Sequence, residues 1–334
     1  MKFSERYATS FDGTKIYYMS AGEGPVICAC NGIGVSVFFW KYLAEYFGRT
    51  HRIILWDYRS HGKSGAAPDY ASLTMSTNAL DLKAVLDSAG ASEAVLLGHS
   101  MGVQTIYEFY RLFPERVAAL IPVLGSYGRP MDTFLNTDKM KYLFPVAYRF
   151  ANCFPHASTR ITQMFYDVLF FGPIAYAGGK VVKFINWQHF KKEDLIPYLD
   201  HMRTLDLRAF LGMARRMQEH SAKDWLPEIK VPVLIISGED DLFTPWKISA
   251  EMHRLIPGSE LLTIPRGSHA ALVEQPELMN LRIEKFMRER LAKGSWAAGG
   301  KKPAPAAAAS ARKTKAPESA VKPRARSRKA QAPA

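Results

Sequence analysis

The 334-residue sequence lacks a long uninterrupted apolar run. A helix that crosses a bilayer needs about 18 or more predominantly apolar residues, and no such stretch occurs. The opening MKFSERYATSFDGTK also lacks the apolar segment of a secretion signal. These absences predict a cytoplasmic protein without a transmembrane segment.

Cysteine is scarce. The three cysteines, Cys28, Cys30 and Cys153, are odd in number, have no CxxC spacing and do not cluster with histidine. A disulfide framework or a structural zinc site requires one of those patterns. The sequence therefore predicts buried free thiols and no metal.

Large apolar side chains are almost absent from residues 294–334. Val321 is the only large aliphatic residue after Trp296, and ten basic residues accompany a single acid, Glu318. Such a composition cannot offset an ordering entropy of about 1–2 kcal/mol per residue, so we expect a disordered tail. A flexible polycation attracts nucleic acid or other polyanions nonspecifically. The alternative is a solubilising tail without a dedicated partner.

The remaining chain has the composition of a globular protein, and its first part alternates β-rich runs with helical ones. The segment 75–89 has amphipathic helical spacing and is followed by Gly90, and a second helical pattern begins after Ser100. The expected strands are residues 5–10, 15–20, 25–30, 52–56, 94–98 and 117–124. This order predicts a mainly parallel sheet with helices on both faces, entered through a hairpin that turns at Asp12-Gly13.

The alternation stops near residue 126 and resumes near residue 231 with strands at 233–237 and 260–264 and a helix at 276–291. The interruption is rich in aromatic residues, with 17 between positions 127 and 220, and its periodicity is helical. We expect a helical cap over the carboxyl edge of the sheet, where open α/β folds bind ligands. The predicted organisation is therefore a first core segment 1–125, a cap 126–225, a second core segment 226–293 and the tail 294–334.

One serine lies between two glycines directly after a buried strand, in the segment "LLGHSMGV". G-x-S-x-G between a strand and a helix forms a turn so tight that side chains at Gly98 and Gly102 would collide, and it raises Ser100 above the sheet. The alternative is a glycine-rich turn with a capping serine.

A serine nucleophile needs a base, and the base needs an acid that orients it. In "LIISGEDDLFTP" a strand leads to Asp240 and Asp241, and in "LLTIPRGSHAALVEQP" the next strand leads to His269. Each group follows a strand of the same sheet. We therefore expect an acid and a base beside Ser100.

These motifs together resemble those of the α/β-hydrolase fold family, over nearly all of residues 5–291. Besides G-x-S-x-G, the chain has G-x-x-D-x-x-x-P from Gly238 to Pro245 and the sequence Gly267-Ser268-His269. The segment "WDYRSHGKS" is similar to the family's D-x-R-G-x-G-x-S turn, with Ser60 in place of a glycine. The resemblance implies an eight-stranded sheet, a helical cap and a triad of Ser100, Asp241 and His269, in which Asp240 only caps its loop.

The resemblance also implies an oxyanion hole. One backbone N–H comes from Met101 and the second from Ile33 in "CNGIGVSVFFW", where Asn31 replaces the histidine of the family's H-G-x-G motif. Asn31 is then either an anchor of this loop or simply a turn residue.

Other polar residues have structural interpretations. We expect His99 to pack beside the turn and Arg59 to anchor the Asp57 turn by hydrogen bonds. His61, His156, His189, His201, His220 and His253 have no metal-ligand spacing, so surface or packing roles are predicted for them.

The predicted function is a serine hydrolase that needs no cofactor and cleaves a small apolar carboxylic ester or thioester through an acyl-enzyme. Acyl transfer, carbon–carbon bond hydrolysis and cofactor-free haloperoxidase chemistry share these motifs and stay open. A non-catalytic binding protein with the same fold is the alternative from another class.

Overall fold

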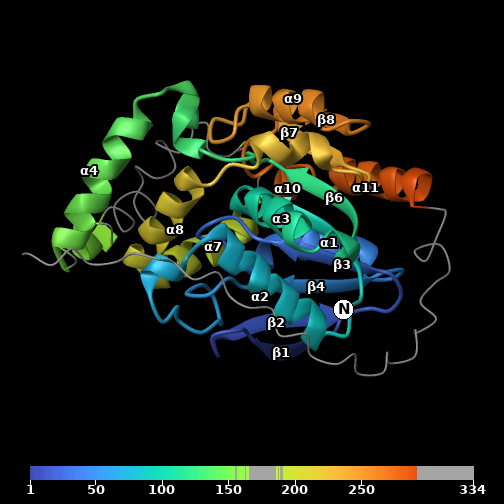
Figure 1. Ribbon diagram of the computed structural model, residues 1–334, viewed down its shortest axis with the longest axis horizontal. Coiled ribbons are helices and arrows are strands. Elements are labelled where there is room, and N and C mark those ends of the chain that lie inside the picture. Colours follow the sequence, from blue (N-terminus) through green and yellow to red (C-terminus); the bar gives the residue numbers. More distant parts are fainter. Residues whose placement is uncertain (155, 162, 165–185, 187, 189–190, 292–334) are drawn as a thin grey trace, which may run out of the picture. The chain divides into compact units, whose positions relative to one another are not determined.

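Apolar β-rich runs form a twisted sheet at the centre of the described residues (Figure 1). The computed structural model describes residues 1–154, 156–161, 163–164, 186, 188 and 191–291. Within them lies an eight-stranded sheet of order β1-β2-β4-β3-β5-β6-β7-β8. The strands are β1 Ser4–Thr9, β2 Lys15–Ala21, β3 Val26–Cys30, β4 Arg52–Trp56, β5 Ala94–His99, β6 Val117–Val123, β7 Leu234–Gly238 and β8 Glu260–Ile264.

The strand directions confirm the predicted mainly parallel sheet. β1 and β2 form an antiparallel hairpin, β2 is antiparallel to β4, and the pairs from β4 to β8 are parallel. The hairpin turns where Gly13 adopts φ +88°, a backbone conformation that favours glycine. It is closed by a hydrogen bond from Ser10 N to Thr14 O of 2.9 Å.

Alternating side chains of the parallel strands enter two different cores. In β3, Ile27 and Ala29 pack on one face, while Cys28 and Cys30 pack on the other. The period of two residues in a strand produces this division. Both faces are therefore covered by helices, as the continuous apolar strands require.

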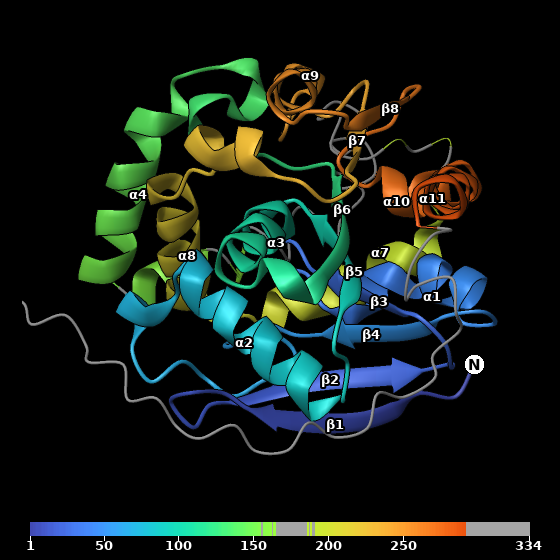
Figure 2. The ribbon, with the colours of Figure 1, turned by 45° about the vertical axis from the view of Figure 1, so that its right-hand side comes forward.

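The helices divide between the two faces (Figure 2). Helices α2, α3 and α9 contribute to the core that contains Cys28, while α1 and α11 contribute to the core that contains Ile27. Their bounds are α1 Lys41–Phe47, α2 Met75–Ser88, α3 Met101–Leu112, α9 Trp246–Leu255, α10 Ala271–Glu274 and α11 Pro276–Arg290. α2 begins where the Thr74 side chain accepts a hydrogen bond from Thr77 N and ends before Gly90 at φ +67°.

Between β6 and β7 the described residues form helices joined by turns and loops, with isolated bridges from Gly128 to Ser221 and from Val233 to Leu120 of β6. The longer helices here are α4 Met140–Cys153, α7 Lys192–Thr204 and α8 Leu207–Glu219. Asp206 caps α8 by accepting hydrogen bonds from Arg208 N and Ala209 N. The middle of the predicted cap and the predicted tail lie outside the described residues.

The thiols only partly match the expectation. Cys28 and Cys30 are buried free thiols in β3, and burial raises the pKa of Cys30 to about 12. Cys153 is free but exposed, so the expectation of burial was wrong there. It lies at the last turn of α4, a helix in which Ala151 is the buried residue.

None of the helices in the described part of the chain combines the length and hydropathy that crossing a membrane would take.

Candidate active site

The turn between β5 and α3 has the tight geometry that its glycines predicted. A Cβ on Gly98 would lie 2.3 Å from Gly102 O, and one on Gly102 would lie 2.4 Å from Cys30 O. Ser100 itself adopts φ 55° and ψ −113°, a conformation that costs about 1–3 kcal/mol in a residue with a side chain. The fold thus tolerates local strain at the residue that presents its hydroxyl.

Ser100, His269 and Asp241 lie in hydrogen-bond contact. His269 Nε2 is 3.0 Å from Ser100 Oγ, and His269 Nδ1 is 2.9 Å from Asp241 Oδ2. Because a carboxylate only accepts, Nδ1 carries the hydrogen and Nε2 is left to accept the serine proton. The ring is therefore oriented as a base toward Ser100.

The loop after β7 determines which aspartate reaches the histidine. Asp241 also accepts hydrogen bonds from Phe243 N, Thr244 N and Thr244 Oγ1, at 2.8, 3.0 and 2.7 Å. Burial opposes its ionisation, but the charge interaction and hydrogen bond with His269 and the bonds from Thr244 outweigh burial, so the pKa of Asp241 is lowered. Asp240 instead donates its backbone N–H to Gly267 O.

Two buried side chains hold the loop that carries His269. Glu274 accepts hydrogen bonds from Ser268 N at 3.1 Å and Ser268 Oγ at 2.6 Å. His99 Nε2 donates to His269 O at 3.0 Å, and the two rings are 4.9 Å apart. Burial lowers the pKa of His99 to about 3, so this ring stays neutral. The expected packing of His99 beside the turn is therefore found, together with a hydrogen bond that the sequence did not suggest.

The loop after β3 passes directly beside the serine. A Cβ on Gly32 would lie 3.2 Å from Ser100 Cβ, and the N–H of Ile33 donates to no described residue. Met101 is the first residue of α3, where backbone N–H groups have no acceptor within the helix. Both predicted oxyanion donors thus belong to segments that adjoin Ser100.

Asn31 is an anchor of this loop and not only a turn residue. Its side chain is buried, its Nδ2 donates to Trp56 O at 2.7 Å, and its Oδ1 accepts from Trp40 Nε1 at 2.9 Å. The amide thereby links the loop after β3 to Trp56 at the end of β4 and to Trp40, which lies farther along the chain from the same loop.

The sequence did not suggest the role of His61. This buried histidine accepts a hydrogen bond from Gly34 N at Nε2, over 3.2 Å, and its Nδ1 donates to Arg59 O. Burial lowers its pKa to about 4. Asp57 holds the same loop through Ser36 Oγ and Val37 N, at 2.6 and 3.2 Å. The D-x-R-G-x-G-x-S turn, in which both residues lie, was the available signal.

Arg59 is an anchor, as expected. Its buried guanidinium pairs with Asp81 of α2 through Nε and Nη2, both at 2.7 Å, and with Asp12 of the hairpin at 2.7 Å. Ser60 has φ 60°, the conformation that the family's glycine adopts easily, and its Oγ accepts from Ala67 N.

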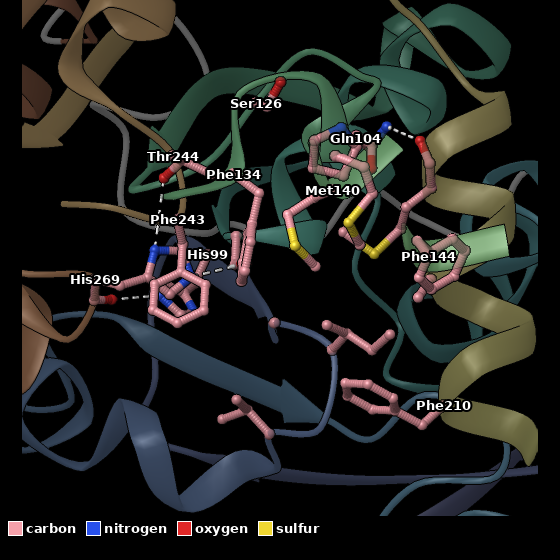
Figure 3. A pocket seen from close by; sticks show the side chains of 18 of the residues that line it. His99, Gln104, Ser126, Phe134, Met140, Phe144, Phe210, Phe243, Thr244 and His269 are labelled. Carbon is pink, nitrogen blue, oxygen red and sulfur yellow. Dashed lines mark hydrogen bonds between the residues drawn. The ribbon is translucent and has the colours of Figure 1, made fainter. Parts of the chain in front are cut away.

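An apolar cavity of about 290 Å³ opens over Ser100 (Figure 3). Its walls come from the loops after β3, β6, β7 and β8 and from α3, α4, α7 and α8, and they contain no Asp, Glu, Lys or Arg among the described residues. Figure 3 shows Phe243 and His99 beside His269, while Phe144 and Phe210 lie across the cavity. In the described part of the chain, no three His, Cys, Asp or Glu side chains gather as metal ligands.

Comparisons with known proteins agree with this fold. The sequence model of a family described as "alpha/beta hydrolase fold" matches residues 25–276. The RutD protein of Azorhizobium caulinodans is 26% identical over 275 residues, which are 82% of this chain and 95% of RutD. A 2-hydroxy-6-oxononadienedioate/2-hydroxy-6-oxononatrienedioate hydrolase of Burkholderia vietnamiensis is 24% identical, over 83% of this chain and 93% of its own. A thermophilic esterase from Thermogutta terrifontis has a similar fold, with a TM-score of 0.70 at 22% identity over 86% of this chain and 98% of the esterase.

Proposed function

The chain belongs to the α/β-hydrolase fold family and is a hydrolase, and we propose that it cleaves an apolar carboxylic ester or thioester with Ser100 as nucleophile. One observation carries this proposal: the Ser100 hydroxyl is hydrogen-bonded to a histidine inside a cavity without charged walls in the described residues. Such a cavity excludes water and strengthens the electrostatic interactions of the reacting groups.

The proposed reaction begins when His269 Nε2 removes the proton of Ser100 Oγ, which attacks the acyl carbon. The carbonyl oxygen becomes an oxyanion, which the N–H groups of Met101 and Ile33 stabilise. His269 then donates the proton to the departing alcohol or thiol, and an acyl-enzyme remains.

Water completes the cycle. His269 Nε2 takes one proton of a water molecule whose oxygen attacks the acyl carbon, and Ser100 regains its hydrogen when the acid departs. Asp241 stays ionised throughout and stabilises the imidazolium, which agrees with the lowered pKa of its carboxyl group.

The cavity supports an uncharged substrate. The Burkholderia relative is named for a dioate, whose two carboxylates would require cationic partners. The described lining of this cavity offers no Lys or Arg. An apolar acyl chain therefore fits these walls better than a dicarboxylate does.

A serine-directed fluorophosphonate tests the proposal directly. We expect one label per chain at neutral pH, on Ser100, and no label on the Ser100→Ala variant. The same two proteins should be assayed with acyl esters and thioesters of increasing chain length. A folded wild-type protein that takes no label and hydrolyses none of these substrates would favour the non-catalytic alternative.

A further inference from the structure

Gln104 places one polar side chain in the apolar cavity, one helical turn after Ser100 in α3. Its side chain lines the cavity, and only 1% of the residue is exposed. Four residues of α-helix rise roughly 6 Å along the axis, so Gln104 lies close to the nucleophile without being part of its hydrogen-bonded triad.

The orientation of the Gln104 amide is fixed by its nitrogen. Nε2 donates to Met217 O at 2.9 Å and approaches His220 Nδ1 at 3.3 Å and His220 O at 3.4 Å. The Met217 carbonyl can only accept, so the nitrogen must face it. Figure 3 shows this bond and the amide at the edge of the cavity.

His220 is itself held in place. Its Nε2 lies 3.5 Å from Glu108 Oε2, and Glu108 also accepts hydrogen bonds from Arg111 and Ser76. Burial opposes ionisation of Glu108, but the hydrogen bonds from Arg111, His220 and Ser76 outweigh it, so its pKa is lowered. This ionised carboxylate favours a hydrogen on His220 Nε2, which leaves Nδ1 as an acceptor for Gln104.

The amide oxygen of Gln104 is left without a donor. Oε1 accepts no hydrogen bond from any residue that the structure describes. The hydroxyl of Ser126 donates to Gly128 O and that of Thr244 donates to Asp241, so neither is available to it. When an apolar chain fills the cavity and displaces water, Oε1 becomes a buried acceptor without a partner, which is unfavourable.

We propose that Gln104 Oε1 accepts a hydrogen bond from a hydroxyl on the acyl chain, so that the substrates are hydroxylated apolar acyl esters or thioesters. This inference rests on the proposed function. A site with a buried polar group discriminates strongly against a ligand that leaves the group unpaired. The hydroxyl gains as well, because most of the described cavity lining is apolar and a hydroxyl buried there without a partner is unfavourable.

The test compares ethyl octanoate with ethyl octanoates that carry a hydroxyl at carbon 3, 6 or 8. We expect kcat/KM for at least one hydroxylated ester to exceed that of ethyl octanoate by tenfold or more. Replacing the preferred hydroxyl by a methoxy group should abolish the preference, because an ether cannot donate. Hydrolysis of ethyl octanoate without preference for any hydroxylated ester would overturn the inference and leave the proposed function standing.

The variant Gln104→Met tests whether Gln104 is the residue that causes the preference for a hydroxylated ester. The methionine keeps the length of the side chain but has no amide, so the preference should fall to twofold or less. Gln218→Met is the matched control, because Gln218 in α8 binds Met131 N and Asp132 and does not line the cavity, and it should keep the wild-type ratio. Fluorophosphonate labelling counts folded active sites in each variant. If the preference remains in Gln104→Met, another group binds the hydroxyl and the inference is wrong. If the wild-type protein shows neither labelling nor hydrolysis, the proposed function is refuted instead.

Discussion

Asn31 holds the loop after β3 through both polar groups of its side-chain amide. It stands where the family motif has histidine, and a neutral imidazole, like an amide, combines a donor group with an acceptor. Both groups of Asn31 are used, by Trp56 O and Trp40 Nε1. Its partners come from other segments, so the sequence motif left open whether Asn31 anchors the loop.

The three proposed catalytic residues were predictable from sequence because each follows a β-rich run inside a short motif. Residues whose roles depend on tertiary contacts were not. His61 was expected to pack or face solvent; it is buried, and it also accepts a hydrogen bond from Gly34 N, 27 positions away, which the sequence did not suggest. Gln104 had no motif around it, and its role depends on Met217, which is 113 positions away.

Ser100 and His269 should act as one unit. We expect Ser100→Ala and His269→Ala each to lower kcat by at least about 10⁴-fold, and the double variant to lower it little further, because loss of either group removes the same step. Single and double variants should be compared by steady-state hydrolysis of one ester. Losses that multiply would contradict a shared mechanism.

Asp240 and Asp241 can be compared directly as the acid that orients His269. Asp241→Asn should reduce kcat severely, because an amide at this position would favour the wrong tautomer of His269. Asp240→Asn should change kcat by less than about tenfold, because the hydrogen bond to His269 comes from Asp241. The reverse ranking in the same assay would assign the acid to Asp240.

At the scale of elements, periodicity was a reliable guide in the sheet and a weak one in the cap. The predicted strands lie within one residue of β1 to β8, and the helix expected at 75–89 is α2, Met75–Ser88. The strands alternate with clear helical patterns, and turn residues such as Gly13 and Gly90 mark their ends. Within the predicted cap, aromatic residues indicated helices but not their bounds, because tertiary packing and not spacing decides which face is buried.

Cap helices supply much of the cavity wall, with Met140 and Phe144 from α4 and Phe210 from α8. We therefore expect kcat/KM to rise from acetyl esters toward medium-chain esters. Each buried methylene contributes about 0.8 kcal/mol, or about fourfold, until the cavity is full. A series of 4-nitrophenyl esters measures this trend.

Phe144→Ala should move the optimum of that series to longer chains, because it removes part of the wall opposite His269 and so enlarges the cavity. Arg208→Ala in α8, outside the cavity lining, serves as the control and should leave the optimum in place. A strict preference for acetyl or for a charged acyl group would contradict the apolar-substrate proposal.

For the whole molecule, buried neutral histidines link stability to pH. Burial lowers the pKa of His61 to about 4 and that of His99 to about 3, below the ordinary value of 6.5. Between these pKa values the unfolded chain binds protons that the folded chain does not. The contribution of each neutral histidine to the free energy of unfolding is therefore fully present above pH 6.5 and is lost as the pH falls toward 4. At pH 5 each of these histidines lowers the free energy of unfolding by about 2 kcal/mol.

Urea unfolding at pH 7 and pH 5 measures this loss. His61→Gln should lose about 2 kcal/mol less than the wild type between the two pH values. The exposed His156 provides the control variant, His156→Gln, which should follow the wild type. An unchanged pH dependence in His61→Gln would show that His61 does not titrate on unfolding as we expect.

We expect the basic tail to bind DNA without contributing to catalysis. We expect a variant without residues 297–334 to keep its kcat/KM on a small ester and to lose retention on DNA at low salt. The tail offers ten cations, and each phosphate neutralised contributes about −0.9 to the slope of log affinity against log salt. Equal DNA binding by the truncated protein, or loss of its esterase activity, would contradict an independent tail.

The separation of β6 from β7 has a consequence for synthesis of the chain. These neighbouring strands are joined by 110 residues, from Leu124 to Val233. A ribosome that adds about 5–20 residues per second needs roughly 5–22 s to traverse that distance. Meanwhile the apolar edge of β6 has no neighbour, and a bare edge of this kind pairs readily with other nascent chains. The length of this insertion therefore sets how long that edge of β6 waits for its neighbouring strand while each new molecule is made.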